Sequence, residues 1–140
     1  DWSQIRPQKF AEVLTKVNQE KGGKVIPTVK LAKAIMRTLP EKQQLSGYHI
    51  ESMSVEIFKS YDGPMTPKAM TTHFFEQASS VAKSPIKDST GQSIHVDDYL
   101  GPENSTKRRI ALMALDRIAR KIKNADGMRS VDIWKKILGE

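Results

Sequence analysis

Two helical patterns joined by a short break decide the fold of this chain. They occupy residues 28–58, which read TVKLAKAIMRTLPEKQQLSGYHIESMSVEIF. In the first half, apolar residues recur at helical spacing and form a single stripe made of Val29, Ala32, Ile35, Met36 and Leu39. Pro27 and Thr28 suit the start of a helix, because a proline at the first helical position gives up an amide hydrogen that has no partner there. Pro40 ends the pattern, so the sequence predicts a central helix between the two prolines.

A second helix is predicted to begin at Ser46. Serine is a good N-cap, because its hydroxyl can accept a backbone amide hydrogen, and Gly47 lets a ligand or another chain approach the backbone closely. The residues that we expect to face the core are Ile50, Met53, Ser54, Ile57 and Phe58. This assignment leaves Ser46, Gly47 and Tyr48 at the N-terminus of the helix.

The same stretch carries groups that could hold a nucleotide. Lys30 and Lys33 are three residues apart, so they are neighbours on the helix surface beside the apolar stripe. A helix N-terminus attracts phosphate through its free amide hydrogens and its positive dipole end. The two lysines and Ser46 could therefore bind phosphates while the ring of Tyr48 contacts the base. The alternative is that the lysines form a solvated surface, Ser46 is only a cap, and Tyr48 packs in or beside the core.

Composition limits the class of protein. The chain has 140 residues, 38% of them hydrophobic and 28% charged, which fits one soluble globular domain. We find no apolar run near the roughly 20 residues that span a bilayer and no signal-peptide pattern, so we expect a cytoplasmic protein without a membrane partner. The absence of cysteine excludes disulfides, and three scattered histidines do not favour a metal site. A net charge of +7 favours polyanionic partners.

Outside the central stretch, the pattern is helical except for one long loop. We expect residues 1–6 to be a linker remnant and residues 7–140 to form a single all-α domain, a compact bundle of about six helices around the central helix. The other helices are predicted to start at Pro7, Thr66, Ser105 or Thr106, and Ser130. Gly22 with Gly23 and later Gly127 are expected to end two of them. The inner face of the helix that follows Thr66 is predicted to hold Ala69, Met70, His73, Phe74, Gln77 and Val81.

Residues 84–104 lack a sustained period and are predicted to form the long loop. Loops of this length in compact domains are often functional. Asp88, Asp97 and Asp98 could hold a metal there, but we favour turn formation at residues 88–91, with Asp97 and Asp98 capping a short turn.

The most basic segment is the predicted helix that contains residues 107–123. Arg108, Arg109 and Arg120 are the candidates for a face that binds RNA or DNA, because contacts to phosphate dominate the affinity of such complexes. No aromatic residue interleaves these cations to stack on bases, so a solvated basic face is the interpretation we favour.

Short motifs along nearly the whole chain match one family of enzymes. They are Asp-Trp at 1–2 with Pro7, Lys-Leu-Ala-Lys at 30–33, Ser-Gly-Tyr-His-Ile-Glu at 46–51, Asp-Ser-Thr-Gly at 88–91, Val-Asp-Asp-Tyr-Leu-Gly at 96–101 and Trp-Lys-Lys-Ile-Leu-Gly at 134–139. They resemble the helical C-terminal lobe of nucleotidyltransferases that make nucleotide second messengers. These enzymes are the bacterial cyclic-oligonucleotide synthases of anti-phage defence, which are related to animal cyclic GMP-AMP synthase and oligoadenylate synthase.

The resemblance implies roles for individual residues. In such enzymes a lysine and a serine contact the triphosphate and an aromatic ring stacks on a base, and these roles fall here on Lys33, Ser46 and Tyr48. Gly47 departs from the family, because a second small hydroxyl residue often stands at that position. The catalytic lobe, with its Gly-Ser turn and its Asp-x-Asp pair that binds metal, has no counterpart in this chain.

The resemblance therefore implies a nucleotide-holding lobe that contains no catalytic residue and no metal site and is inactive by itself. Magnesium, nucleoside triphosphates and the missing catalytic lobe are expected in the whole enzyme. Two alternatives stay open at this point. One is a free-standing basic helical module that binds nucleic acid or protein, and the other is the corresponding lobe of an enzyme that adds nucleotides to RNA ends.

Overall fold

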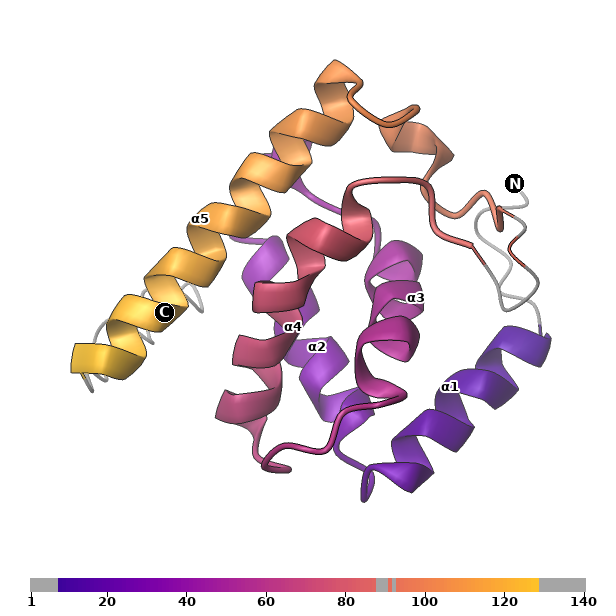
Figure 1. Cartoon of the computed structure of the whole chain (residues 1–140), viewed down its shortest axis with the longest axis vertical. Helices are drawn as coiled ribbons and strands as arrows, with labels where there is room; N and C mark the ends of the chain where they lie inside the picture. The colour runs from indigo at the N-terminus through magenta and orange to yellow at the C-terminus, as the bar shows by residue number, and fades with distance from the viewer. Residues whose placement is uncertain (1–7, 88–90, 92, 129–140) are drawn as a thin grey trace.

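A computed structural model of the chain describes residues 8–87, 91 and 93–128. These residues form five α-helices and two short 3-10 helices, and no strand occurs among them (Figure 1). The elements in chain order are α1 (Gln8–Glu20), α2 (Val25–Met36), η2 (Glu41–Gln43), α3 (Gly47–Phe58), α4 (Pro67–Ala82), η3 (Asp98–Leu100) and α5 (Thr106–Met128). The all-α prediction is confirmed. The sixth helix, predicted from Ser130, lies outside the described residues.

Two helices begin where their capping residues predict. The Ser46 hydroxyl accepts the amide hydrogen of His49 at 3.2 Å, and α3 starts at the next residue. The Thr66 hydroxyl likewise accepts the amide hydrogen of Ala69 at 3.2 Å, and Pro67 occupies the first position of α4. Each cap satisfies one of the amide groups that a helix leaves without an internal partner, so the sequence fixes both starts locally.

The start and the end of α2 differ from the prediction. The helix begins at Val25, two residues before Pro27, and it ends at Met36 rather than at Pro40. Proline is tolerated anywhere in the first turn, because no amide there has a partner within the helix. The Asn18 side chain supplies an outside partner, since its carbonyl oxygen accepts the amide hydrogen of Ile26 at 2.9 Å.

The predicted stop after α1 is confirmed. The helix ends at Glu20, and Gly22 and Gly23 then adopt φ angles of 65° and 75°. Glycine adopts such left-handed conformations without the steric cost that other residues incur. At the other end of the chain, α5 continues to Met128, one residue beyond the Gly127 that was predicted to end it.

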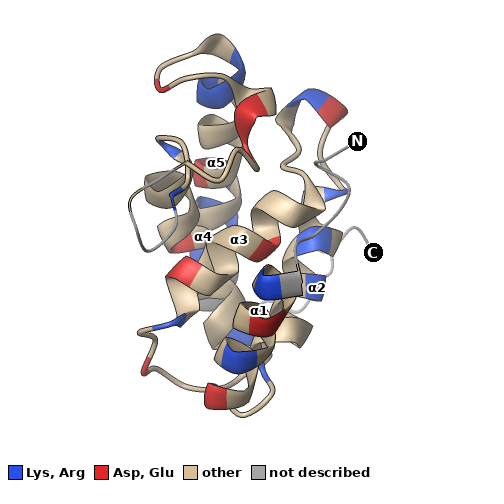
Figure 2. Cartoon of the chain, turned by 90° about the vertical axis from the view of Figure 1, so that its right-hand side faces the viewer, with Lys and Arg blue, Asp and Glu red and all other residues tan. Residues whose placement is uncertain are grey.

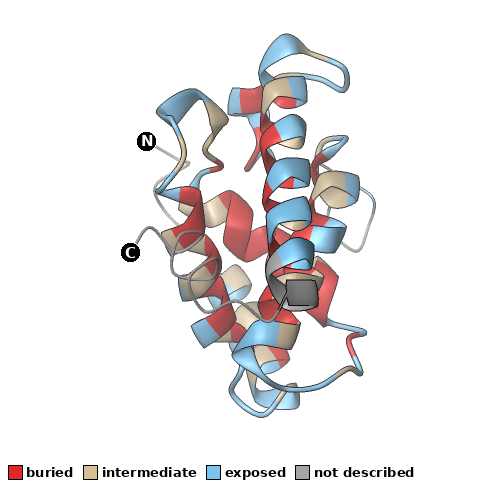
Figure 3. Cartoon of the chain, turned by 90° about the vertical axis from the view of Figure 1, so that its left-hand side faces the viewer, coloured by how far each residue is buried: buried red, intermediate tan, exposed pale blue. Residues whose placement is uncertain are grey.

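Helices α2, α3 and α4 form the centre of the bundle, with α1 and α5 on opposite sides of it (Figure 1). Helix α4 packs against α2, α3 and α5, whereas α2 packs against α1, α3 and α4, so the centre is shared among three helices. All five residues predicted for the inner face of α3 are buried. Figure 3 shows buried residues facing the interior and exposed residues along the outer side of α5.

The inner face of α4 is rotated from the predicted one. Its buried residues are Met70, Thr71, Phe74, Phe75, Ala78 and Ala82. Gln77 is exposed, and His73 and Val81 are only half-buried. Because α4 is covered by α2 and α3 on one side and by α5 on another, its buried surface is wider than a single stripe and has a different centre.

The predicted long loop connects α4 to α5, and its second half folds back on the bundle. Ile86, Val96 and Leu100 are buried, and η3 forms one short turn at Asp98–Leu100. The predicted turn at residues 88–91 falls almost wholly outside the described part of the chain. Among the described residues, no helix is long and apolar enough to cross a membrane.

Candidate functional site

The structure brings Lys33 of α2 against the first turns of α3. The Lys33 ammonium lies 2.5 Å from Oε2 of Glu51. Glu51 is four residues after Gly47, so the two lie on the same face of α3, one turn apart. The pair therefore places Lys33 beside α3, one turn after the start of that helix. Figure 2 shows the side of the molecule on which α1, α2 and α3 lie, with basic and acidic residues interspersed.

The two lysines differ in environment. The Lys33 side chain is 25% exposed and its partner Glu51 is 10% exposed, so the ion pair is partly shielded from solvent. Lys30, one turn earlier on α2, is exposed. The charge of Lys33 is thus already partly compensated by a carboxylate, whereas Lys30 is the solvated lysine that the alternative interpretation expects.

Ser46 is held by three hydrogen bonds at the start of α3. Its hydroxyl caps the amide of His49, its carbonyl accepts the amide hydrogen of Ile50 at 3.1 Å, and its own amide donates to the Tyr99 phenol oxygen at 2.9 Å. Ser46 itself is exposed. The first turn of α3 is therefore fixed in place while remaining open to solvent at the capping residue.

Tyr48 lies at the edge of the core. Its ring centroid is 4.9 Å from that of Phe10 on α1, with the two planes tilted by 56°, and the residue is half-buried. Helix α1 therefore supports the ring that the sequence assigns to the base. The contact with Phe10 was not predicted, because residues 38 positions apart share no local pattern.

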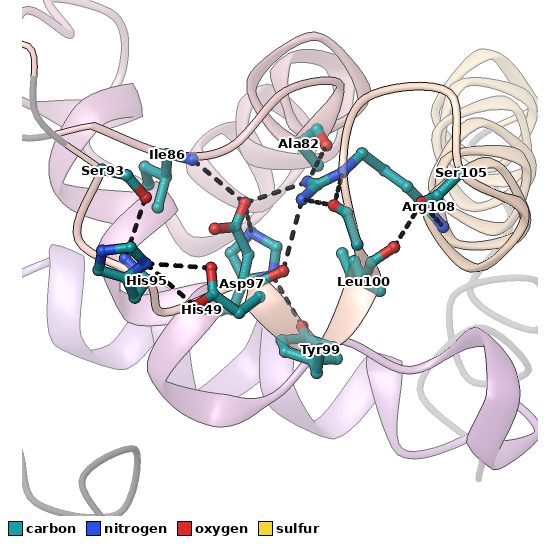
Figure 4. A network of polar contacts seen from close by, with 12 residues as sticks. His49, Ala82, Ile86, Ser93, His95, Asp97, Tyr99, Leu100, Ser105 and Arg108 are labelled. Carbon is teal, nitrogen blue, oxygen red and sulfur yellow. Dashed lines mark hydrogen bonds and ion pairs between the residues drawn. The ribbon is translucent and has the colours of Figure 1, made fainter.

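Behind the first turn of α3, the long loop is fastened by a buried ion pair (Figure 4). Arg108 of α5 is 1% exposed and Asp97 is completely buried. The Arg108 Nη1 atom lies 3.0 Å from Oδ2 of Asp97, and the same guanidinium donates hydrogen bonds to the carbonyls of Ala82 and Gly101. The pair thus joins the end of α4, the loop and the start of α5.

This finding corrects two predictions. Arg108 does not belong to a nucleic-acid face, because its guanidinium points inward and donates to a carboxylate and to backbone carbonyls. Asp97 does not cap η3 with its side chain, and its Oδ2 accepts from Arg108 and from the amide of Ile86 instead. Arg109 and Arg120 are exposed, as a nucleic-acid face requires. In the described part of the chain, no group of three His, Asp or Glu residues is arranged to hold a metal ion.

His49 connects the ion pair to the start of α3. Its Nδ1 atom is 2.7 Å from the Tyr99 phenol oxygen, and its Nε2 atom is 3.8 Å from Oδ2 of Asp97. Burial lowers the pKa of His49 to about 4, against the opposing effect of the Asp97 charge. The ring is therefore neutral at pH 7. The Tyr99 phenol oxygen accepts the Ser46 amide hydrogen, and the histidine tautomer decides which partner donates in its contact with Nδ1. The Nε2 atom of His49 has no hydrogen-bond partner among the described residues.

His49, Tyr99 and Arg108 were missed as parts of this site. Residues 46–51 and 96–101 stand out in the sequence as separate motifs, and this was the one available signal that both segments matter. Their contact could not be inferred from spacing, because Ser46 and Tyr99 are 53 positions apart.

Comparison of the chain with models of known protein families, with curated proteins and with solved structures found no match. The resemblance to the cyclic-oligonucleotide synthases therefore stays a prediction from the short motifs. The geometry of α2, α3 and the loop is the independent observation on which a function can be proposed.

Removal of the Asp97 charge should destabilise the fold severely. The substitution Asp97→Asn leaves Arg108 buried without its counter-ion, and we expect a loss of about 3–5 kcal/mol in the free energy of unfolding. Asp98→Asn is the matched control, because Asp98 is exposed, and it should cost less than about 0.5 kcal/mol. Urea denaturation measures the free energy of unfolding of both variants. Equal losses would show that the buried ion pair stabilises the fold no more than the exposed Asp98 does.

Stability should fall with acidification through protonation of His49. The pKa of His49 is about 4 in the folded chain against an ordinary value of 6.5, so between these pH values the unfolded chain binds the proton more readily. We expect this residue to remove up to roughly 3 kcal/mol of unfolding free energy as the pH falls from 7 to 4. The measurement is the pH dependence of urea denaturation. His49→Gln should reduce this dependence, and a dependence that stays unchanged in this variant would contradict the assignment.

Proposed function

We propose that this chain is the helical, nucleotide-holding lobe of a nucleotidyltransferase that makes a nucleotide second messenger from nucleoside triphosphates. The observation that carries the proposal is the placement of Lys33 against the first turns of α3, whose N-terminus bears Ser46, Gly47 and Tyr48. The short motifs quoted from the sequence support the same family. An enzyme that adds nucleotides to RNA ends would use a lobe of the same plan.

In this proposal the phosphates bind between α2 and the start of α3. The N-terminus of α3 supplies the positive end of a helix dipole, and Ser46 supplies an exposed hydroxyl. Lys30 supplies a solvated cation, whereas Lys33 has to share its charge between the phosphate and Glu51. Glu51 thus holds the Lys33 ammonium in position before a nucleotide arrives.

The base would lie on Tyr48. Phe10 packs against this ring, with the two centroids 4.9 Å apart, and so supports it from the side of α1. Stacking on an aromatic ring tolerates every base, because each base has a π-face. Tyr48 would accordingly add affinity without selecting one nucleotide.

The catalytic metals belong to the lobe that the chain lacks. The described residues offer no cluster of carboxylates that fits magnesium, so no chemical step is assigned to them. The contribution of this lobe is to position the nucleotide, which accounts for much of the rate in phosphoryl-group transfer. By itself the chain should bind nucleotide without converting it.

Nucleotide binding can be tested on the 140-residue chain by titration with ATP and magnesium, followed by NMR. We expect the amide signals of Lys30, Lys33 and residues 46–48 to shift, and Tyr48→Leu to weaken binding about tenfold through loss of stacking. Lys30→Ala should weaken binding as well, because it removes an exposed cation from the phosphate site. Lys42→Ala is its matched control, since Lys42 is equally exposed but lies on η2.

The position of Ser46 is tested with glycine rather than alanine. Glycine preserves the cap to within a few tenths of a kcal/mol, so a loss of affinity reports the hydroxyl and not the fold. Binding that is absent at millimolar ATP, or that falls equally with Lys30→Ala and Lys42→Ala, contradicts the proposed site.

The outer face of α5 supports a second candidate function, which is binding to the phosphate backbone of nucleic acid. Its exposed cations are Lys107, Arg109, Arg117, Arg120, Lys121 and Lys123, and Asp116 is the one exposed acid among residues 106–124. A row of exposed cations on a helix is the electrostatic pattern that binding to a phosphate backbone requires. Without Arg108, the face is defined by Arg109, Arg117 and Arg120.

Neutralising this face should flatten the salt dependence of binding. For double-stranded DNA, replacing Arg109, Arg117 and Arg120 together by glutamine should reduce the slope of log affinity against log salt by about 0.9 for each phosphate that the protein no longer neutralises. Fluorescence anisotropy of a labelled duplex measures the slope. The control is replacement of Lys9, Lys16 and Lys24, which are exposed on or next to α1 and carry the same total charge. Equal effects of the two triple substitutions would show that binding depends on the net charge of the chain and not on this face.

A further inference from the structure

The long loop between α4 and α5 contributes a residue to the proposed nucleotide site. We propose that Tyr99 is a positioning residue: its phenol oxygen completes the N-terminal cap of α3 without a negative charge and so holds that helix end ready for phosphate. The inference rests on the proposed function and assigns the residue that fixes the geometry of its phosphate site.

The contacts of Tyr99 are directed at the cap. Its oxygen accepts the Ser46 amide hydrogen at 2.9 Å. The same oxygen bonds Nδ1 of His49 at 2.7 Å (Figure 4). The Tyr99 and His49 rings meet edge to face, with centroids 5.8 Å apart. One oxygen atom thus links the capping residue of α3 to the third residue of the helix.

This arrangement resembles a capping box in which a second residue takes over one of the two hydrogen bonds. In a capping box the N-cap hydroxyl accepts the amide of the third helical residue, and a Glu or Gln at that third position bonds back to the N-cap amide. Here the first bond is present between Ser46 and His49. The return bond runs from His49 through the Tyr99 oxygen to the Ser46 amide. The long loop therefore supplies the Tyr99 oxygen that accepts the Ser46 amide hydrogen. In a capping box, the side chain of the third helical residue accepts this hydrogen itself.

The charge of the cap is what matters for a phosphate. A glutamate at the third position would put a carboxylate at the helix N-terminus, where it would satisfy the dipole and repel an anionic ligand. His49 and Tyr99 do the same hydrogen bonding while uncharged, because burial lowers the pKa of His49 and raises the pKa of Tyr99. The positive end of α3 is thereby left for a ligand.

Tyr99 is held from the side away from the cap. Its neighbours Asp97 and Leu100 are buried, and Asp97 is bonded to Arg108. The Ser105 hydroxyl also donates to the Leu100 carbonyl at 2.5 Å. Tyr99 itself is 40% exposed, so its ring lies at the surface beside Ser46. The buried residues Asp97 and Leu100 therefore hold the Tyr99 backbone in place. The surface around the phenol stays accessible to a ligand at the start of α3.

The decisive variant is Tyr99→Phe, which keeps the ring and removes only the oxygen. Loss of one hydrogen bond that positions the site corresponds to about a fivefold weaker affinity. We expect this loss for ATP and equally for inorganic triphosphate, because Tyr99 acts on the phosphate end. Tyr48→Leu, in contrast, should weaken the binding of ATP and leave the binding of inorganic triphosphate unchanged. Hydrogen exchange of the Ser46 amide should also become faster in Tyr99→Phe.

The matched control is Tyr61→Phe. The Tyr61 phenol donates to the Pro64 carbonyl at 2.7 Å at the other end of α3, so this variant also loses phenol hydrogen bonding, with one bond removed where Tyr99→Phe removes two. It should leave triphosphate affinity and Ser46 exchange unchanged. Equal weakening in both tyrosine variants would mean that general destabilisation is responsible, and the inference would be wrong.

The remaining outcomes separate this inference from the proposed function. If the unchanged chain binds ATP and triphosphate and Tyr99→Phe binds them as tightly, Tyr99 is not a positioning residue and the proposed function stands. If the unchanged chain binds neither, the proposed function fails and this inference fails with it.

Discussion

The buried ion pair between Asp97 and Arg108 is the interaction on which the arrangement of the site depends. Removing two charges from water costs several kcal/mol each, and such a pair persists only where hydrogen bonds satisfy the remaining donors and acceptors. Here the amide of Ile86 donates to Oδ2 of Asp97, and the carbonyls of Ala82 and Gly101 accept from the guanidinium, whereas Oδ1 of Asp97 has no hydrogen-bond partner among the described residues. Because these groups come from the end of α4 and both halves of the loop, the pair closes the loop onto α5. Tyr99 reaches Ser46 only as a consequence of that closure.

Charge is divided between two tasks in this chain. The paired charges, Lys33 with Glu51 and Asp97 with Arg108, hold elements together and are partly or fully shielded from solvent. Other cations, including Lys30 and those on the outer face of α5, are exposed to solvent. The net charge of +7 belongs to the chain as a whole, whereas each of these two ion pairs is neutral as a set.

How far the sequence predicted the structure depended on the range of the interaction. The caps at Ser46 and Thr66, the glycine stop after α1 and the inner face of α3 were predicted correctly, because each is decided by residues within about one or two helical turns. The inner face of α4 was misplaced, since packing against α5 added a second buried side. Arg108 was placed on the wrong face, because an arginine in a basic helix gives no local sign that a carboxylate will meet it.

The sequence by itself determined the helical class and most helix boundaries, and it predicted Lys33, Ser46 and Tyr48 as residues that could bind a nucleotide. Periodicity and capping depend on residues that are close together in the chain, so they can be predicted from the sequence. Only the tertiary structure decided that Glu51 pairs with Lys33, that Phe10 supports Tyr48, and that Tyr99 completes the cap of α3. Those contacts join residues 18 to 53 positions apart, and they arise from the way the packed helices and the closed loop share one interior.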